Sequence, residues 1–289
     1  MNNSIPSGEC KICGSSSLEV FHHTAKCKDC GVLLYYPYPA GDGDLAESAM
    51  GKKYPRHIAI EWYLKSSFYN HDNFTKMVRF AIEDPGRYKE PDVLDYGGGG
   101  GQFALVFKSL FPLSRVYMTD INDDSLLDQW KSCNEQIPFN QFMSDPLKFD
   151  FIFLCDVFEH LSHPEATLVQ LASKLKNGGK IFIDTPKQFW IYTLAKFFSK
   201  EIYLKLLRGT VSEAHLQIWT GKSLNLVIKN SGLKISKYAE MCEYTMPPDF
   251  YMDNMHIRSW ALRLAGRIFY SASAVFVKNK IMCVLSQSA

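Results

Sequence analysis

Short apolar runs alternate along the chain with segments in which apolar residues recur every three to four positions. Three of the runs end in an acid, at Asp95, Asp120 and Asp156, and a fourth covers residues 175–186. The segments with helical periodicity are 102–111, 164–175 and 220–230, and the apolar stretches 233–242 and 280–286 are two further predicted strands. Strands of this length alternating with helices indicate an α/β fold built on a largely parallel sheet.

Five consecutive glycines, residues 97–101, follow the first run directly. Glycine adopts backbone conformations that let a loop approach a ligand closely, so a strand, this loop and a helix in succession favour nucleotide binding. Gly99-x-Gly101-x-x-Ala104 satisfies the dinucleotide fingerprint, which would place a pyrophosphate at the helix N-terminus. Asp95-x-Gly97-x-Gly99-x-Gly101 instead places an acid where it would repel a pyrophosphate and attract the sulfonium and ammonium groups of S-adenosylmethionine (SAM). The acid favours SAM, and a flexible loop without a ligand is the third alternative.

Later motifs extend this interpretation. Asp120 lies 19 residues beyond Gly101, a spacing that suits a carboxylate accepting two ribose hydroxyls. There follow Phe-Asp-Phe-Ile-Phe-Leu-Cys-Asp156, Val-Phe-Glu-His160-Leu, and Leu-Lys-Asn-Gly-Gly with a later Thr-Pro. Over residues 89–242 this series resembles the class I SAM-dependent methyltransferases. The resemblance implies a Rossmann-like, seven-stranded sheet with helices on both faces and an antiparallel last strand at 280–286.

The same resemblance assigns residues to the cofactor. Asp145, or Ser144 beside it, would contact the adenine, with an ordinary turn acid before Pro146 as the alternative. Asp156 would lie near the methionine moiety or the acceptor, or would only brace its loop. The residues that we expect to bind the cofactor are Asp95, Gly97, Gly99, Gly101, Asp120, Ile121, Asp145 and Asp156.

Two C-x-x-C-G knuckles lie near the N-terminus and contain Cys10, Cys13, Cys27 and Cys30. Four thiolates in paired turns of this kind make a tetrahedral zinc site, and because they fill the coordination shell the zinc would be structural. A disulfide framework is the alternative, but nothing in the sequence indicates an oxidising compartment. Placed ahead of a methyltransferase core, the knuckles resemble the N-terminal zinc ribbon of bacterial enzymes of sugar, surface-polysaccharide or secondary-metabolite pathways.

Two histidines are candidates for the base that deprotonates an acceptor. His160 follows the predicted strand 149–156, and His215 follows the strand 175–186 and its insertion. In zinc-ribbon sugar C-methyltransferases a Tyr-x-Glu-His cluster lies at a similar place, but here the matching positions are Ser212, Ala214 and His215. Only the histidine is kept, so transfer to oxygen or nitrogen is favoured over transfer to carbon. The alternative for both histidines is a structural role.

The predicted organisation has three parts: a zinc ribbon over residues 1–40, a helical linker or cap over 41–88, and the SAM-binding domain over 89–289. Two aromatic and basic insertions, near 188–210 and 246–278, do not belong to a minimal methyltransferase core. They are interpreted as helices packed on the core, as a lid or acceptor pocket, or as a contact with a membrane surface or a biosynthetic complex.

Composition narrows the function. The chain has 289 residues and a net charge of +2, with its basic residues scattered rather than clustered, so no nucleic-acid partner is expected. The first residues lack an apolar signal segment, and no run approaches the ~18 apolar residues of a membrane span, which predicts a cytoplasmic location.

We therefore predict a SAM-dependent methyltransferase with a structural zinc and a small-molecule acceptor, with a sugar or nucleotide sugar favoured. One alternative is an RNA or protein methyltransferase that uses the ribbon to bind a macromolecule. It would be favoured by a basic surface around Lys11, Lys26, Lys28, Lys52 and Lys53. The other alternative is a non-catalytic protein that keeps the methyltransferase fold as a partner module.

Overall fold

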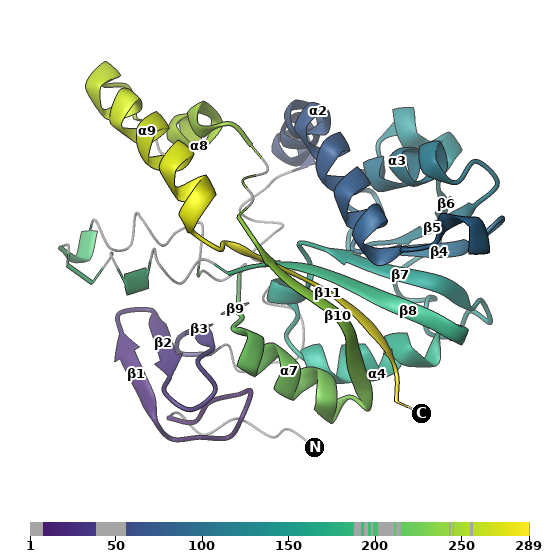
Figure 1. Cartoon of the computed structure of the whole chain (residues 1–289), viewed down its shortest axis with the longest axis horizontal. Coiled ribbons are helices and arrows are strands. Elements are labelled where there is room, and N and C mark those ends of the chain that lie inside the picture. Colours follow the sequence, from purple (N-terminus) through teal and green to yellow (C-terminus); the bar gives the residue numbers. More distant parts are fainter. Residues whose placement is uncertain are drawn as a thin grey trace.

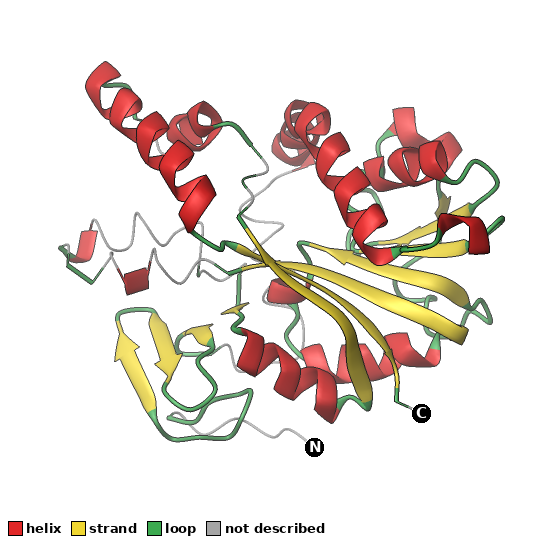
Figure 2. Cartoon of the chain, viewed as in Figure 1, coloured by secondary structure: helices red, strands yellow, loops and turns green. Residues whose placement is uncertain are grey.

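A mixed seven-stranded sheet forms the centre of the computed structural model (Figures 1 and 2). The structure describes residues 8–38, 56–187, 192–193, 196–197, 199–201, 211, 215–242, 244, 246–254 and 257–288. The strand order is β10-β11-β8-β7-β4-β5-β6. The strands are β4 (Asp92–Tyr96), β5 (Arg115–Thr119), β6 (Glu135–Gln136), β7 (Phe149–Cys155), β8 (Leu175–Pro186), β10 (Leu233–Met241) and β11 (Lys280–Gln287).

The strand directions confirm the predicted fold class. β4 is parallel to β5 and β7, β5 is parallel to β6, and β7 is parallel to β8. β11 pairs antiparallel with both β8 and β10, as the resemblance implied for the last strand. The parallel strands therefore present their carboxyl ends at one edge, where open α/β sheets bind ligands.

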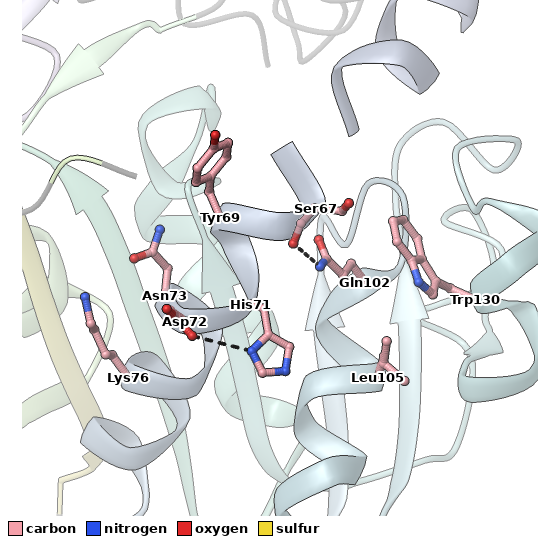
Figure 3. Close-up of a pocket in the computed structure, with 9 residues that line it drawn as sticks. All are labelled: Ser67, Tyr69, His71, Asp72, Asn73, Lys76, Gln102, Leu105 and Trp130. Carbon is pink, nitrogen blue, oxygen red and sulfur yellow. Dashed lines mark hydrogen bonds and ion pairs between the residues drawn. The ribbon is translucent and has the colours of Figure 1, made fainter. Parts of the chain in front are cut away.

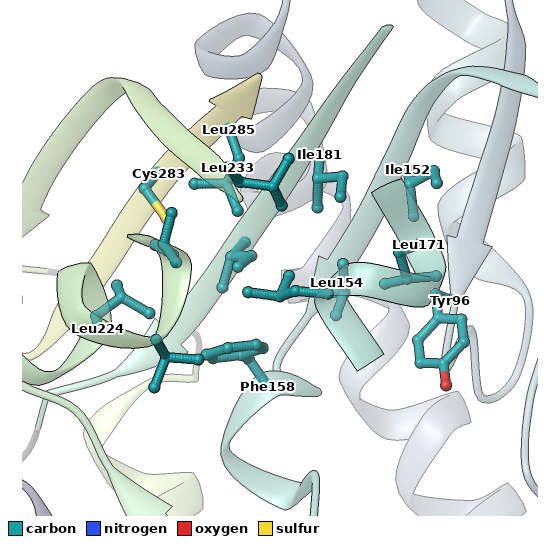
Figure 4. Packing of buried hydrophobic residues seen from close by; sticks show 14 of the residues in the cluster. Tyr96, Ile152, Leu154, Phe158, Leu171, Ile181, Leu224, Leu233, Cys283 and Leu285 are labelled. Carbon is teal, nitrogen blue, oxygen red and sulfur yellow. The ribbon is translucent and has the colours of Figure 1, made fainter. Parts of the chain in front are cut away.

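Helices cover both faces of this sheet (Figure 1). On one face, α2 (Arg56–Ala81) and α3 (Gln102–Leu110) pack on a cluster that includes Phe103, Phe107, Phe151 and Phe153. On the other face lie α4 (Pro164–Ser173) and α7 (Gly221–Asn230). Figure 4 shows the core that they cover, with residues of the sheet beside Leu171 of α4 and Leu224 of α7.

Side-chain alternation along β7 explains the two clusters. From Phe151 onward the faces alternate: Phe151 and Phe153 belong to the cluster under α2 and α3, and Ile152 and Leu154 to the cluster under α4 and α7. Phe149 also belongs to the second cluster, and the register of β7 against β8 shifts between Phe149 and Phe151. A central strand covered on both faces must be apolar throughout, which is why this segment is an unbroken apolar run apart from Asp150. Burial of each such side chain stabilises the fold by about 1.5–3 kcal/mol.

The N-terminal segment shares a sheet with a strand from the second half of the chain. β1 (Leu18–Phe21), β2 (Thr24–Cys27) and β3 (Leu33–Tyr35) are antiparallel, and β9 (Gln217–Ile218) pairs with β3. Thr220 Oγ1 also donates a hydrogen bond to the Cys30 carbonyl at 2.9 Å, and Lys11 donates to the carbonyl of Ser162. The N-terminal unit is therefore bonded to the large domain, which supplies β9 as the fourth strand of the small sheet.

The segments outside the minimal core differ in whether they pack on the sheet. α2 lies within the predicted helical linker or cap, residues 41–88, and buries Met77, Val78 and Ala81. Residues 39–55 lie outside the described part of the chain. Most of the insertion at 188–210 also lies outside it. The second insertion forms α8 (Pro248–Asn254) and α9 (Trp260–Phe276), which extend away from the sheet in Figure 1. The interpretation of this insertion as helices packed on the core is wrong for α9, because most of the large apolar side chains of α9 are exposed.

Candidate active site

The glycine loop follows β4 and leads directly into α3. Gly97 and Gly101 have φ angles of 76° and 85°, in the region that disfavours other residues. At Gly97 a Cβ would lie 2.6 Å from the Val157 side chain, and at Gly101 a Cβ would lie 2.3 Å from Leu126. Two other loops thus approach the glycine backbone, one from beyond β7 and one from beyond β5. The absence of side chains is what lets the three segments meet.

Asp95 lies beneath this loop with unsatisfied hydrogen-bonding capacity. Its side chain is buried, and its Oδ2 has no hydrogen-bond partner among the described residues. Burial and the charge of Asp120 raise the pKa of Asp95 to about 8. A buried acid without a partner is costly, and a neighbouring cation offsets that cost. The site therefore fits a cationic ligand such as SAM and disfavours a pyrophosphate.

Asp120 follows β5 and is fixed by backbone amides. Gly99 N donates to its Oδ2 and Asn122 N donates to its Oδ1, both at 2.9 Å. Burial raises the pKa of Asp120 although these bonds oppose the shift. Each carboxylate oxygen keeps a second lone pair, so the group can also accept hydroxyl donors. Ile121 beside it is exposed, and so is Phe139, whose amide donates to Asp123 Oδ1 at 3.1 Å in the same loop.

Asp145 bonds within the fold near the start of β7, and its contact with the adenine stays a prediction. The Asp145 carbonyl accepts a hydrogen bond from Lys174, which directly precedes β8, and its Oδ1 accepts from Leu147 N at 2.8 Å. Asp145 therefore lies at the amino ends of the strands, opposite the glycine loop. The chain crosses between the two edges after β6, so residues at 137–139 lie beside the cofactor edge.

Asp156 ends β7 in a left-handed backbone conformation, with φ of 53°. Its carboxylate accepts hydrogen bonds from Lys280 Nζ at 2.7 and 2.9 Å, and Lys280 also contacts the buried Asp184. Burial alone would lower the pKa of Lys280, but the charges of Asp156 and Asp184 hold it well above its usual range. Neither Lys280 nor Asp184 was predicted. The available signal was a lysine at the start of one apolar run, residues 281–285, and an aspartate at the end of another, residues 181–183.

His160 and His215 lie together at the same edge. Their ring centroids are 4.7 Å apart, and His160 Nε2 lies 3.8 Å from Oε1 of the buried Glu159. Thr185 Oγ1 donates to Glu159 Oε2 at 3.0 Å. Burial, followed by the charge of Asp156, raises the pKa of Glu159 well above its usual range. The structure thus joins the two predicted histidines, and adds a carboxyl group that the sequence analysis had not assigned.

This second group of side chains can also hold a metal ion. The ligand atoms of Glu159, His160 and His215 all lie within 4.8 Å of one another. Two imidazoles and a carboxylate suit divalent first-row metals, although the donors would need to move closer together to share one ion.

The four predicted zinc ligands also converge. Their sulfur atoms lie within 4.8 Å of one another, with separations of 3.7 Å for Cys10–Cys30 and 3.5 Å for Cys13–Cys27. Tetrahedral zinc with bonds of about 2.3 Å requires separations of about 3.8 Å. The cluster therefore fits a zinc ribbon.

A separate pocket of about 620 Å³ lies between α2, α3 and the 3₁₀ helix η2 (Asp128–Cys133). Figure 3 shows Gln102 of α3 directed toward Ser67 of α2, and His71 beside Asp72 at 3.6 Å. None of the residues predicted to bind SAM lines this pocket. We therefore do not assign it to the cofactor.

Comparisons with known proteins agree with this geometry. A sequence profile of the methyltransferase domain matches residues 63–238, more than half of the chain. The ubiquinone/menaquinone biosynthesis C-methyltransferase UbiE of Cupriavidus taiwanensis is 28% identical over 120 residues, which cover 38% of this chain and 49% of that protein. The ubiquinone biosynthesis O-methyltransferase of Saccharophagus degradans is 24% identical over 224 residues, covering 70% and 87%. The chain spans about half the length of the first of these relatives.

The fold has similar solved structures. The plantazolicin methyltransferase BpumL in complex with SAH aligns with a TM-score of 0.52 at 18% sequence identity, covering 85% of this chain and 94% of that one. At this level of identity the likeness shows the fold alone. The sheet order, the acids around the glycine loop and the profile match lead to the same assignment: the chain belongs to the methyltransferase domain family and has its class I SAM-binding fold.

Proposed function

We propose that the chain is a SAM-dependent methyltransferase that modifies an oxygen or nitrogen atom of a small acceptor, a sugar or nucleotide sugar. One observation carries the proposal: the acids of the glycine loop and the His160–His215 pair lie at the same edge of the sheet. The sugar class rests on the resemblance of the N-terminal ribbon to that of sugar-modifying enzymes. The four cysteines outside the ribbon are also unpaired, which fits the reducing cytoplasm.

SAM supplies the reactive methyl group, and the residues of the chain hold and align the reactants. Asp120 would accept ribose hydroxyls, and Asp95, once ionised, would face the cationic cofactor from beneath the loop. Alignment of the reacting atoms alone can lower the barrier of such a transfer by ~7–11 kcal/mol.

A hydroxyl or amine acceptor must also lose a proton. We assign removal of this proton to the His160–His215 pair, with His215 as the first candidate base. Glu159 lies beside His160. A placed base contributes about 10²–10⁴-fold to the rate. A divalent cation held by Glu159, His160 and His215 is the second candidate for activating the acceptor, because their donor atoms already converge.

We further propose that the ribbon holds one structural zinc ion. Four buried or half-buried thiolates leave no coordination position for a substrate, so the ion would fix the fold of residues 10–30. The RNA-binding alternative is less well supported. Lys11, one of its required cations, contacts the Ser162 carbonyl and lies 3.8 Å from the centroid of the Tyr38 ring, so it is used within the molecule.

Asp120→Ala should weaken SAM binding, because the carboxylate can no longer accept the ribose hydroxyls. Loss of hydrogen bonds to a charged group costs about 1.5–3 kcal/mol, which corresponds to a roughly 10- to 100-fold higher Kd by titration calorimetry. Asp128→Ala, at an exposed acid of the nearby 3₁₀ helix, is the matched control and should leave the Kd unchanged. Absence of SAM binding by the wild type would leave only the non-catalytic alternative, and equal binding by Asp120→Ala would show that Asp120 does not hold the ribose.

SAM binding should also weaken as the pH falls. Because the pKa of Asp95 is about 8 in the free protein, its carboxyl group is mostly uncharged below that pH. A cationic ligand binds the ionised form more tightly, so the Kd should rise as pH falls through about 8, by up to about tenfold per pH unit. The stability of the free protein changes with pH in the opposite direction. Between pH 3.8 and about 8 the folded state keeps a proton on Asp95 that the unfolded state has lost, so the free energy of unfolding decreases as pH rises through this range.

Asp95→Asn is the control for this pH effect. Its Kd should change little with pH apart from the titration of the cofactor's own amine, which calorimetry in the same buffers measures. A wild-type pH dependence identical to that of the variant would show that Asp95 does not contribute.

Purified protein should contain about one zinc ion per chain by elemental analysis. Cys27→Ser should lose it and lower the thermal midpoint, because β3 and the Cys30 carbonyl of the same unit are both bonded to the rest of the fold. Cys133→Ser, outside the cluster, should keep the full zinc content. A folded wild-type protein without zinc would refute the ribbon assignment.

Transfer of radiolabelled methyl from SAM to a panel of nucleotide sugars tests the acceptor class directly. With an active acceptor, His215→Gln should reduce kcat by about 10²–10⁴-fold and leave the Kd for SAM unchanged, whereas His163→Gln should behave as wild type. If a chelator abolishes the activity while the ribbon zinc is retained, the acceptor is activated by a cation at Glu159, His160 and His215 and not by a histidine base. Unchanged kcat in both His215→Gln and His160→Gln would exclude the pair from the reaction.

A further inference from the structure

α9 presents a continuous apolar face to solvent. Along its 17 residues, Ser273 is the one buried side chain, while Trp260 is 78% exposed and Phe276 is 82% exposed. The other exposed large apolar residues of the helix are Leu262, Leu264, Ile268, Phe269 and Val275. At ~100° per residue these side chains, with three alanines and Ser271 between them, cover about 200° of the helix circumference.

The opposite face of α9 is held firmly against α8 and the segment before it. The rings of Tyr270 and Tyr251 stack at 5.2 Å, Tyr244 Oη lies 2.8 Å from Ser273 Oγ, and Arg263 Nη2 donates to Asp249 at 2.8 Å. A Cβ on Gly266 would lie 2.4 Å from the Met252 sulfur atom, so the two helices are in close contact there. The exposed face is therefore the outer surface of a fixed hairpin.

The chain segment that carries this face contains no acid, and the acids of α8 beside it, Asp249 and Asp253, are in ion pairs with its arginines. From residue 257 to residue 278 every charged side chain is cationic: Arg258, Arg263, Arg267 and Lys278. Arg263 and Arg267 form ion pairs with acids of α8, whereas Arg258 and Lys278 lie at the two ends of α9 and are exposed. The apolar arc itself contains no charge. An uncharged face with a cationic border complements a layer that is apolar inside and anionic at its surface.

We propose that α9 binds the surface of an anionic phospholipid membrane, lying in the plane of the interface. The apolar face would enter the headgroup–acyl boundary, Trp260 would lie at the headgroup level, and the cations would contact lipid phosphates. Self-association is disfavoured, because packing two copies through this face would bring their cationic borders together. Spanning is not an alternative, since none of the described helices has the length and apolar character to cross a bilayer.

Membrane binding through α9 would also orient the catalytic edge. The helix leads through three residues into Lys280, the cation that contacts Asp156, and Lys280 pairs with Pro186 at the carboxyl end of β8. Docking of α9 therefore brings the edge that holds the candidate active site close to the lipid headgroups. An acceptor attached to a lipid would reach the site from that side.

Sedimentation of the full chain with sucrose-loaded vesicles tests the proposal without any acceptor. The protein should bind vesicles of equal parts phosphatidylcholine and phosphatidylglycerol more strongly than vesicles of phosphatidylcholine alone. The double variant Leu264→Glu/Ile268→Glu should lower the partition coefficient at least about tenfold. Arg258→Ala should lower it about fivefold on the anionic vesicles, and added salt should lower the binding of the wild type.

Leu113→Glu is the matched control, because Leu113 is also an exposed leucine, at 65%, but lies after α3. It should bind vesicles as the wild type does. Circular dichroism should show each variant folded, and Trp260→Ser with Phe276→Ser tests the same face by a milder change. The proposal is overturned if the wild type does not bind anionic vesicles, or if the α9 variants bind as well as the wild type. A dimer in sedimentation equilibrium that the double variant disrupts, without vesicle binding, would identify a second copy as the partner instead.

Discussion

The accumulation of carboxyl groups at one edge of the sheet is the constraint on which the site depends. Parallel strands end together, so acids that lie far apart in the sequence become neighbours there: Asp95, Asp120, Asp156, Glu159 and Asp184. Asp95, Glu159 and Asp184 are buried, and burial makes a charge expensive unless a cation or hydrogen-bond donors compensate it. Lys280 does this for Asp156 and Asp184, and backbone amides do it for Asp120. Within the described part of the chain, Oδ2 of Asp95 has no such partner, which makes Asp95 the group most sensitive to a bound cation.

The antiparallel strand β11 has a chemical as well as an architectural role in this arrangement. Insertion of its first residue between β8 and β10 brings an amine from the end of the chain into a cluster built by earlier strands. In the same way, the glycine loop depends on residues from two other loops, Val157 and Leu126, which occupy the space that side chains would fill. The site is therefore assembled from at least four separated segments.

Much of the fold could be predicted from the sequence, because periodicity reports directly on local structure. The apolar runs gave the strands, and helices 102–111, 164–175 and 220–230 agree with α3, α4 and α7 to within two residues at each end. The location of Asp95, Asp120 and Asp156 at the carboxyl ends of strands was also predictable, because each acid ends an apolar run. The location of Asp145 could not be predicted from the sequence, because the chain between β6 and β7 crosses from one edge of the sheet to the other without a helix that would mark the crossing.

Other features depend on contacts between distant residues, which periodicity does not encode. Nothing in the spacing of Glu159 and His215 indicates that they approach each other, and nothing in Gln217–Ile218 indicates that it completes the sheet of the N-terminal unit. The apolar residues of α9 were visible in the sequence, but the sequence alone left open whether they are buried, and the structure shows that they are not.

The pairing of β3 with β9 has a mechanical consequence. β9 begins two residues after His215, so the hydrogen bonds that hold Gln217 and Ile218 to β3 also limit where the histidine can lie. Any loosening of the cysteine knuckles would be transmitted along this short strand to the imidazole. Metal loss from the ribbon could therefore resemble the loss of a catalytic ion in an activity assay, although the ribbon metal would never touch the reactants.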